Sequence, residues 1–200
     1  MALAALTLDA ATQDDTKSWT EVPFGDAGFD SSSRTLPWDP TVPIRIPATE
    51  VQIKGVIDRL DLRSGRAAVR VSDYKTGERP RQVDSLVIDG GKELQRTLYG
   101  LACQQLIPNC ERIIARLVYL RDVPHASALG NLTEAVEQIT GFVRCACATL
   151  TKGVALPGQD AETEAADLRI AWPASPAYWR RKGSAFSQAS DDLSHYWGAK

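Results

Sequence analysis

Three charged side chains near the middle of the chain have the types and spacing of a metal site: Asp58, Asp73 and Lys75. Two carboxylates and an ammonium group gathered on one face of a sheet are costly to desolvate unless something binds between them. A divalent cation with oxygen ligands would satisfy carboxylates of this kind. The chemistry therefore depends on whether the chain brings these three side chains together.

The segments that carry them have the pattern of a β-hairpin. The segments on either side of residues 63–66 are rich in β-branched side chains, over residues 51–62 and 67–74. A hairpin loop centred in 63–66 places Asp58 opposite Val71. Because side chains alternate along a strand, Asp73 and Lys75 share the face of Val71, and Asp58 is within diagonal reach of Asp73. The hairpin thus predicts a site for Mg²⁺ or Mn²⁺.

The rest of the chain predicts an α/β domain with a mixed sheet. Apolar periodicity, breakers and capping residues indicate the following elements: a strand over 19–24, a loop over 25–47, a connection over 78–91, a helix over 92–107, a strand over 112–120 and a helix from Asn131 to about Lys152. Asn131 and Glu134 have the spacing of a capping box. On the first helix, Gln95 and Tyr99 are four residues apart and therefore share a face.

Length and composition suit one globular domain. The chain has 200 residues, 44% hydrophobic and 24% charged, with a formal net charge of −2. No apolar run is long enough to span a membrane, and the first residues lack the pattern of a signal peptide. The sequence predicts a cytoplasmic protein with reduced thiols and without a membrane partner.

Several motifs resemble those of a nuclease family. Residues 55–61, GVIDRLD, and residues 73–77, DYKTG, look like the GxxDRxD and DYKTG motifs of the PD-(D/E)XK nuclease superfamily. The most similar branch is the RecB/AddB-like nuclease domain of bacterial recombination helicase–nucleases. Residues 95–99, QRTLY, fit the QxxxY motif of this branch, and residues 19–25 look like its first core strand. The resemblance covers residues 18–182.

The resemblance implies a restriction-endonuclease-like fold and a role for each matched residue. Asp58 and Asp73 would hold the metal with the backbone carbonyl of Tyr74. Lys75 would orient or deprotonate the attacking water, or stabilise charge on the phosphate. Gln95 and Tyr99 would contact the metal-bound water or the DNA backbone. A structural ion-pair cluster and ordinary helix-surface polarity are the alternatives for these residues.

The implied function is hydrolysis of DNA with Mg²⁺ or Mn²⁺, as an exonuclease acting on single-stranded ends in DNA repair or recombination. A helicase subunit is the implied protein partner. Seven basic residues lie between positions 59 and 81, and we expect three of them to contact the DNA backbone: Arg59, Arg79 and Arg81. The alternative is a catalytically degenerate DNA-binding or scaffolding domain.

The start of the chain departs from the family pattern. The family's first core helix precedes the first strand and supplies a further acidic or histidine ligand, whereas the residues before Trp19 contain neither His nor Glu. We therefore expect the first core helix to be missing, with residues 1–17 a remnant or flexible start, 18–182 the nuclease-like domain and 183–200 a tail. Glu21 could replace the missing ligand, but a strand-surface acid is the more ordinary interpretation.

The cysteines and histidines do not predict a further cofactor. Many RecB/AddB-like domains hold an iron–sulfur cluster through late cysteines, and the corresponding residues 175–182 contain none, so we expect no cluster. The four cysteines are predicted to be buried small hydrophobes: Cys103, Cys110, Cys145 and Cys147. His125 and His195 are predicted to lie on the surface, in a loop and in the tail. Residues 178–182, YWRRK, could contact nucleic acid or close the fold.

Overall fold

The computed structural model describes residues 15–28, 35–63, 68–85, 87–91, 93–121 and 123–154. A five-stranded sheet has the order β1-β4-β5-β6-β7. Its strands are β1 (Thr16–Phe24), β4 (Gly55–Arg63), β5 (Ala68–Lys75), β6 (Arg112–Tyr119) and β7 (His125–Ala128). The β5–β6 pair is parallel and the other pairs are antiparallel, which makes the sheet mixed. The predicted α/β fold class is therefore confirmed.

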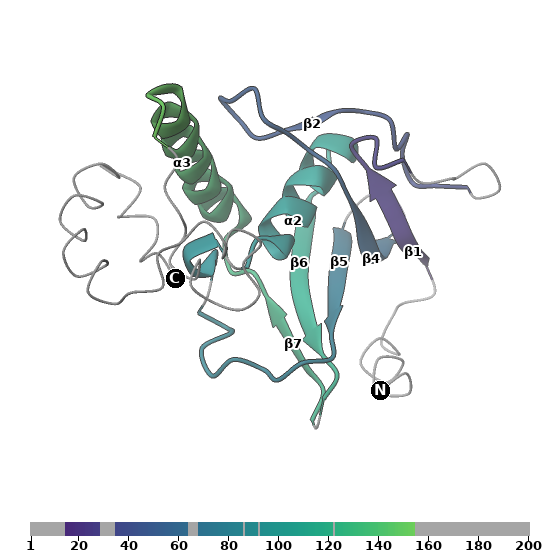
Figure 1. Cartoon of the computed structure of the whole chain (residues 1–200). Helices are drawn as coiled ribbons and strands as arrows, with labels where there is room; N and C mark the ends of the chain where they lie inside the picture. The colour runs from purple at the N-terminus through teal and green to yellow at the C-terminus, as the bar shows by residue number, and fades with distance from the viewer. Residues whose placement is uncertain are drawn as a thin grey trace.

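Two helices and two short elements complete the described fold. Helix α2 (Gln95–Leu106) connects the parallel strands β5 and β6 and packs across both of them, and α3 (Leu132–Thr151) packs beside α2 (Figure 1). Strands β2 (Ile44–Arg45) and β3 (Gln52–Ile53) form a small hairpin, and Asp89–Gly91 forms one 3₁₀ turn before α2. Parallel neighbours require a crossover connection, and α2 supplies it on the face of the sheet that carries Lys75.

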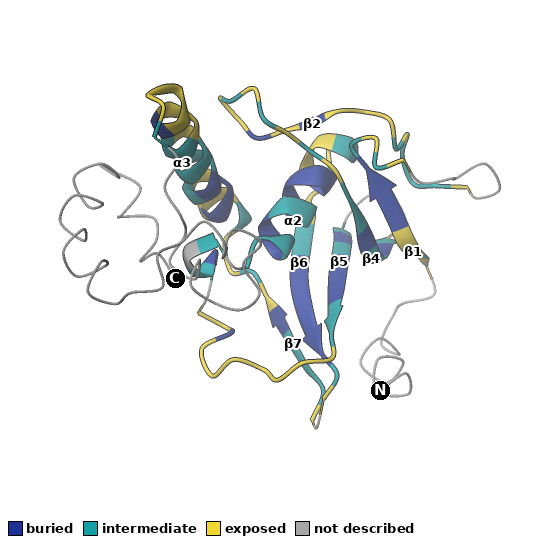
Figure 2. Ribbon diagram, in the orientation of Figure 1, coloured by how far each residue is buried: buried dark blue, intermediate teal, exposed yellow. Residues whose placement is uncertain are grey.

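The core lies between α2 and the sheet. Val69 and Val71 of β5 and Ala115 of β6 pack there against Ala102 and Cys103 of α2, and all five are buried. Figure 2 shows β5 and β6 dark blue along much of their length, while the end of α3 is exposed. Because Val71, Asp73 and Lys75 alternate with outward residues on one strand, Asp73 and Lys75 continue the helix-covered face of β5.

The predicted hairpin register is wrong by two residues. Val71 lies opposite Leu60 rather than Asp58, and Arg59 lies opposite Ser72. The next step of this register sets Asp58 across from Asp73. A shift of two residues leaves every side chain on its original face, since the side-chain period of a strand is two. The prediction of a shared face for Asp58 and Asp73 therefore does not depend on the error.

Other boundaries differ from the predictions for local reasons. The strand predicted over 51–62 is divided at Lys54 into β3 and β4, and the helix predicted from Lys92 begins at Gln95. The predicted loop at His125 is wrong, because residues 125–128 pair with β6 as β7. The predicted start of α3 is confirmed: Asn131 is the N-cap, and its side chain accepts a hydrogen bond from Glu134 N (3.2 Å). Residues 1–14 and 155–200, including His195, the tail and the sequence YWRRK, lie outside the described residues.

Two glycines after β1 allow a matched test of the contact between the end of β1 and β3. Gly25 and Gly28 both have left-handed backbones, with φ of 67° and 71°. A β-carbon at Gly25 would collide with the carbonyl oxygen of Ile53, whereas one at Gly28 would meet nothing within 4 Å. Gly25→Ala is therefore expected to lower the free energy of unfolding by about 3 kcal/mol, and Gly28→Ala by about 1 kcal/mol. Thermal unfolding followed by circular dichroism compares the two, and equal melting temperatures would contradict the β1–β3 contact.

Candidate active site

Asp58 is positioned by the backbone of the neighbouring strand. Its Oδ2 accepts a hydrogen bond from the backbone N–H of Tyr74 (2.8 Å), and the side chain is half-buried. The contact occurs where the β4–β5 pairing ends, so the carboxylate takes up an N–H that the ladder leaves unpaired. Asp58 is thus held beside Asp73 and the Tyr74 peptide.

Asp73 is the most buried acid of the site. It is 3% exposed, and its Oδ2 lies 2.7 Å from Lys75 Nζ as an ion pair without hydrogen-bond geometry. Burial raises the pKa of the Asp73 carboxyl above its ordinary value, and the charges of Asp58 and Glu93 act in the same direction while Lys75 opposes them. A buried carboxylate oxygen without a hydrogen bond is a ready ligand for a cation.

Lys75 links the sheet to the helix. Its ammonium group donates a hydrogen bond to Gln95 Oε1 in the first turn of α2 and forms the ion pair with Asp73. The Lys75 side chain is 33% exposed, so solvent or a substrate can reach it. The structure therefore brings together Asp73, Lys75 and Gln95. Gln95 accepts a hydrogen bond from Lys75, whereas the sequence predicted that Gln95 contacts the metal-bound water or the DNA backbone.

Tyr99 lies one turn further along the same face of α2. Its Oη donates to the carbonyl oxygen of Val56 in β4 (3.0 Å), and its ring meets Phe24 edge-on at a centroid distance of 6.1 Å. Burial raises the pKa of Tyr99 to about 12, and the negative charges of Asp73 and Asp58 add to this. Tyr99 is therefore a neutral donor near both aspartates at ordinary pH.

The sequence analysis missed a buried arginine beside the site. Arg96 is 1% exposed and donates to Glu93 Oε2 (2.8 Å), Ser127 Oγ (3.1 Å) and the carbonyl oxygen of Val83 (3.4 Å). These bonds tie the start of α2 to β7 and to the loop after β5. The three-residue spacing of Glu93 and Arg96 was the available signal, but it does not reveal burial. Arg96 fixes the helix turn that carries Gln95.

The three arginines predicted to bind DNA fall in two places. Arg59 Nε donates to Asp61 Oδ1 (2.9 Å), and Asp61 is itself 3% exposed. Arg59 and Asp61 are one and three residues from Asp58, so they belong to the opposite face of the strand. Arg79 and Arg81 are exposed in the segment that follows Lys75, and Arg79 lines a cavity of about 360 Å³ with Arg121. The structure therefore sets Arg59 apart from the site and leaves Arg79 and Arg81 beside it.

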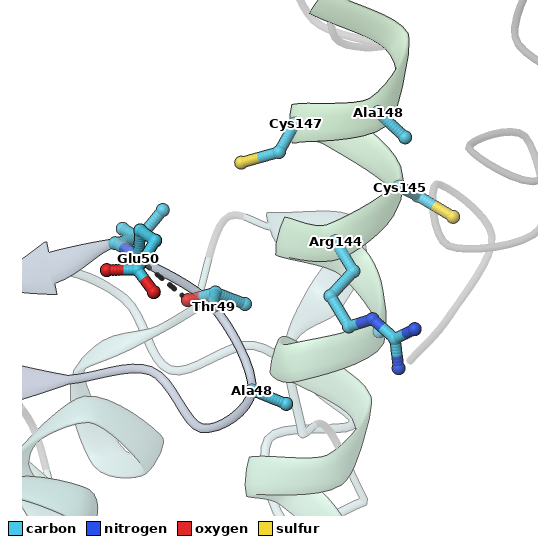
Figure 3. A pocket seen from close by; sticks show the side chains of 9 residues that line it. Ala48, Thr49, Glu50, Arg144, Cys145, Cys147 and Ala148 are labelled. Carbon is cyan, nitrogen blue, oxygen red and sulfur yellow. Dashed lines mark hydrogen bonds between the residues drawn. The ribbon is translucent and has the colours of Figure 1, made fainter. Parts of the chain in front are cut away.

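A second cavity lies elsewhere in the described part of the chain. A space of about 560 Å³ separates the β2–β3 hairpin around Thr49 and Glu50 from α3 around Arg144 (Figure 3). None of the predicted site residues lines it. Its polar groups come from side chains of opposite charge on a mostly apolar surface, so it offers no set of ligands comparable to the paired aspartates.

The cysteines divide by burial. Cys103 is fully buried in the core, where burial raises the pKa of its thiol, and this agrees with its prediction as a small hydrophobe. Cys147 is exposed, which makes that prediction wrong at this position, because it lines the open space between α3 and the β2–β3 hairpin. Cys145 and Cys147 point in different directions from the helix (Figure 3). All four cysteines are free thiols.

The described donors fit a hard divalent cation in part. Asp58 and Asp73 supply carboxylate oxygens, and the Asp73 oxygen without a hydrogen bond is suited to a metal. Within the described ranges, no three His, Cys, Asp or Glu side chains are already gathered as a metal site. The two aspartates alone therefore make an incomplete set of oxygen ligands.

The mixed sheet thus carries two aspartates and a lysine on the neighbouring strands β4 and β5, beside the crossover helix α2. A family model described as the PD-(D/E)XK nuclease superfamily matches residues 1–180, and the chain belongs to this superfamily. Nucleases of this superfamily generally use divalent metals such as Mg²⁺. Comparisons with curated proteins and with solved structures found no match. No helix among the described residues is long and apolar enough to cross a membrane.

The raised pKa of Asp73 predicts how the metal-free protein responds to pH. A folded-state pKa above the unfolded value means that the folded chain keeps its proton to higher pH. The resulting stability is fully present below the unfolded pKa and is lost as pH rises through the folded pKa. In EDTA, the wild-type protein should therefore lose stability as pH rises. Asp73→Asn should lose less of its stability and should have a higher melting temperature than wild type at pH 7. Adding Mn²⁺ should then stabilise wild type alone. If the melting temperatures of the two proteins change with pH in the same way, burial does not raise the pKa of Asp73.

Proposed function

We propose that this chain is a metal-dependent deoxyribonuclease of the RecB/AddB-like type. It would degrade single-stranded DNA from an end, in DNA repair or recombination and in the cytoplasm, with a helicase subunit as partner. The observation that carries the proposal is the contact of Lys75 with both Asp73 and Gln95. Residues from two separated motifs, DYKTG and QxxxY, meet there through the fold rather than through sequence proximity.

Each residue of the site has a role that follows from its surroundings. Asp58, Asp73 and the Tyr74 carbonyl would hold Mg²⁺ or Mn²⁺. When bound, the cation supplies a Lewis acid for the phosphate and lowers the pKa of a water molecule. Lys75, held between Asp73 and Gln95, would orient that water or stabilise negative charge on the phosphate. Tyr99 would donate its hydroxyl hydrogen to the DNA backbone, in place of the hydrogen bond that it now donates to the Val56 carbonyl.

DNA would approach over the segment that follows β5. Arg79 and Arg81 are exposed there, close in sequence to Lys75. We expect both arginines to contact phosphates rather than bases, so affinity for single-stranded DNA should fall steeply with salt and vary little with sequence. Because Arg59 is bound to Asp61, we expect it to support the strand and expect Arg59→Ala to affect stability more than DNA affinity.

The proposal is tested by comparing substrates that differ only in their ends. Linear single-stranded DNA, circular single-stranded DNA and blunt duplex DNA are incubated with the protein and Mn²⁺, with EDTA as the control. We expect degradation of the linear single strand only, and none in EDTA. Degradation of the circle would instead indicate an endonuclease, and equal loss of the duplex would contradict the single-strand preference.

A degenerate DNA-binding domain is the second candidate. The ion pair between Asp73 and Lys75 occupies part of the metal site, and the described residues gather no third ligand. Such a domain would bind single-stranded DNA equally well in Mn²⁺ and in EDTA and would degrade none of the substrates. This outcome would replace the nuclease proposal.

A further inference from the structure

A left-handed residue interrupts β1 beside the two aspartates. Glu21 has φ of 51°, an uncommon conformation for a residue other than glycine. Its neighbours Thr20 and Val22 pair with Arg59 and Ile57, and the ladder skips the position between them. Glu21 therefore lies across from Asp58, on the side of β4 opposite to Asp73.

The Glu21 side chain lies at the surface of the described structure. The residue is exposed, and it makes no hydrogen bond or ion pair within the part of the chain that the structure describes. Because Glu21 lies on the strand next to Asp58, a side chain as long as glutamate has the reach to approach it. The charge of Glu21 also acts on Tyr99, whose pKa is raised mainly by burial and then by Asp73, Asp58 and Glu21. The carboxylates of Asp73, Asp58 and Glu21 thus all lie near enough to Tyr99 to raise its pKa.

The burial of Asp73 is a second observation at this place. The side chain is 4% exposed, and the one partner that its Oδ2 has among the described residues is the ammonium group of Lys75, at 2.7 Å. Lys75 neutralises one of the two charges on Asp58 and Asp73, so these three side chains leave a net charge of about −1 to face a divalent cation. A third carboxylate would balance the cation.

We propose that Glu21 is the third carboxylate ligand of the site and turns toward Asp58 and Asp73 when a divalent cation binds. The proposal rests on the proposed function and deepens it, since it completes the same metal site from the edge strand. The left-handed backbone interrupts the ladder at Glu21, at the position of β1 that lies across from Asp58. The three carboxylates are not gathered in the described structure, so the inferred movement is a change of the Glu21 side chain.

The test measures Mn²⁺ binding to the full chain by electron paramagnetic resonance and calorimetry. Glu21→Gln is expected to weaken Mn²⁺ binding about tenfold or more, and Glu21→Gly is expected to do the same while relieving the left-handed backbone. Glu111→Gln removes an exposed acid before β6 and serves as the control, with wild-type affinity expected. Glu21→Gly should also melt no lower than wild type in EDTA, which separates loss of a ligand from loss of folding.

Two outcomes would overturn the inference in different ways. If Asp73→Asn loses Mn²⁺ while both Glu21 variants bind as wild type does, Glu21 is no ligand and the proposed nuclease site stands. If wild type itself binds no Mn²⁺, the proposed metal-dependent function fails together with the role of Glu21.

Discussion

Replacing Lys75 with alanine is expected to reduce metal-dependent DNA degradation by about 10²- to 10⁴-fold, the range of a positioned acid–base or charge-stabilising group. Lys75 lies between Asp73 and Gln95, where its ammonium can act on water or phosphate. Because the cation would be held by carboxylates, affinity for Mn²⁺ should be unchanged or slightly higher once the ion pair with Asp73 is gone. Rates on end-labelled single-stranded DNA and Mn²⁺ titrations measure the two effects separately.

Lys54→Ala is the matched control for this prediction. Lys54 is an exposed lysine between β3 and β4, and its removal changes the net charge by the same amount. We expect its rate to remain near that of wild type. If Lys75→Ala and wild type degrade DNA at the same rate, the activity does not come from this site, and the degenerate binding domain becomes the better account.

Asp58→Asn is expected to lose both Mn²⁺ binding and activity. An asparagine keeps an oxygen that can accept the hydrogen bond from Tyr74 N, so the local fold should persist while the ligand charge is removed. We expect Mn²⁺ affinity to fall at least about 100-fold, a loss of ~2.7 kcal/mol, and degradation to fall below detection. Calorimetry with Mn²⁺ and the same DNA assay provide the measurements.

Asp26→Asn controls for the loss of one surface charge. Asp26 is exposed and has φ of 58°, a conformation that asparagine tolerates. Its metal affinity and activity should match wild type. Retention of wild-type Mn²⁺ affinity by Asp58→Asn would mean that the cation binds elsewhere.

The sequence predicted the elements whose signals are local. The nearly continuous apolar run of β6 and the cap at Asn131 each depend on neighbouring residues, and both appear in the structure where they were expected. The face shared by Asp58 and Asp73 was also predictable, since alternation along a strand survives an even register error. The register itself depends on the geometry of the hairpin loop, which composition does not specify.

The features that the sequence did not predict depend on tertiary contacts. Strand β7 has the sequence HASA, with little β-propensity, and forms because its backbone pairs with the edge of β6. In the sequence, Arg96 has no feature that distinguishes it from a surface arginine. Its burial depends on hydrogen bonds to Glu93, Ser127 and the Val83 carbonyl, which only the folded chain brings around it. The contact of Lys75 with Gln95 likewise requires the crossover that places α2 over β5.

Crystals of the chain soaked in Mn²⁺ test the central claim most directly, through an anomalous difference map. The account predicts one strong peak between Asp58 and Asp73, about 2.0–2.5 Å from an oxygen of each carboxylate. Asp73 should then contact the metal in place of Lys75. A map without a peak between these aspartates, with the Asp73–Lys75 ion pair intact at a saturating Mn²⁺ concentration, would contradict the claim that they form a metal site.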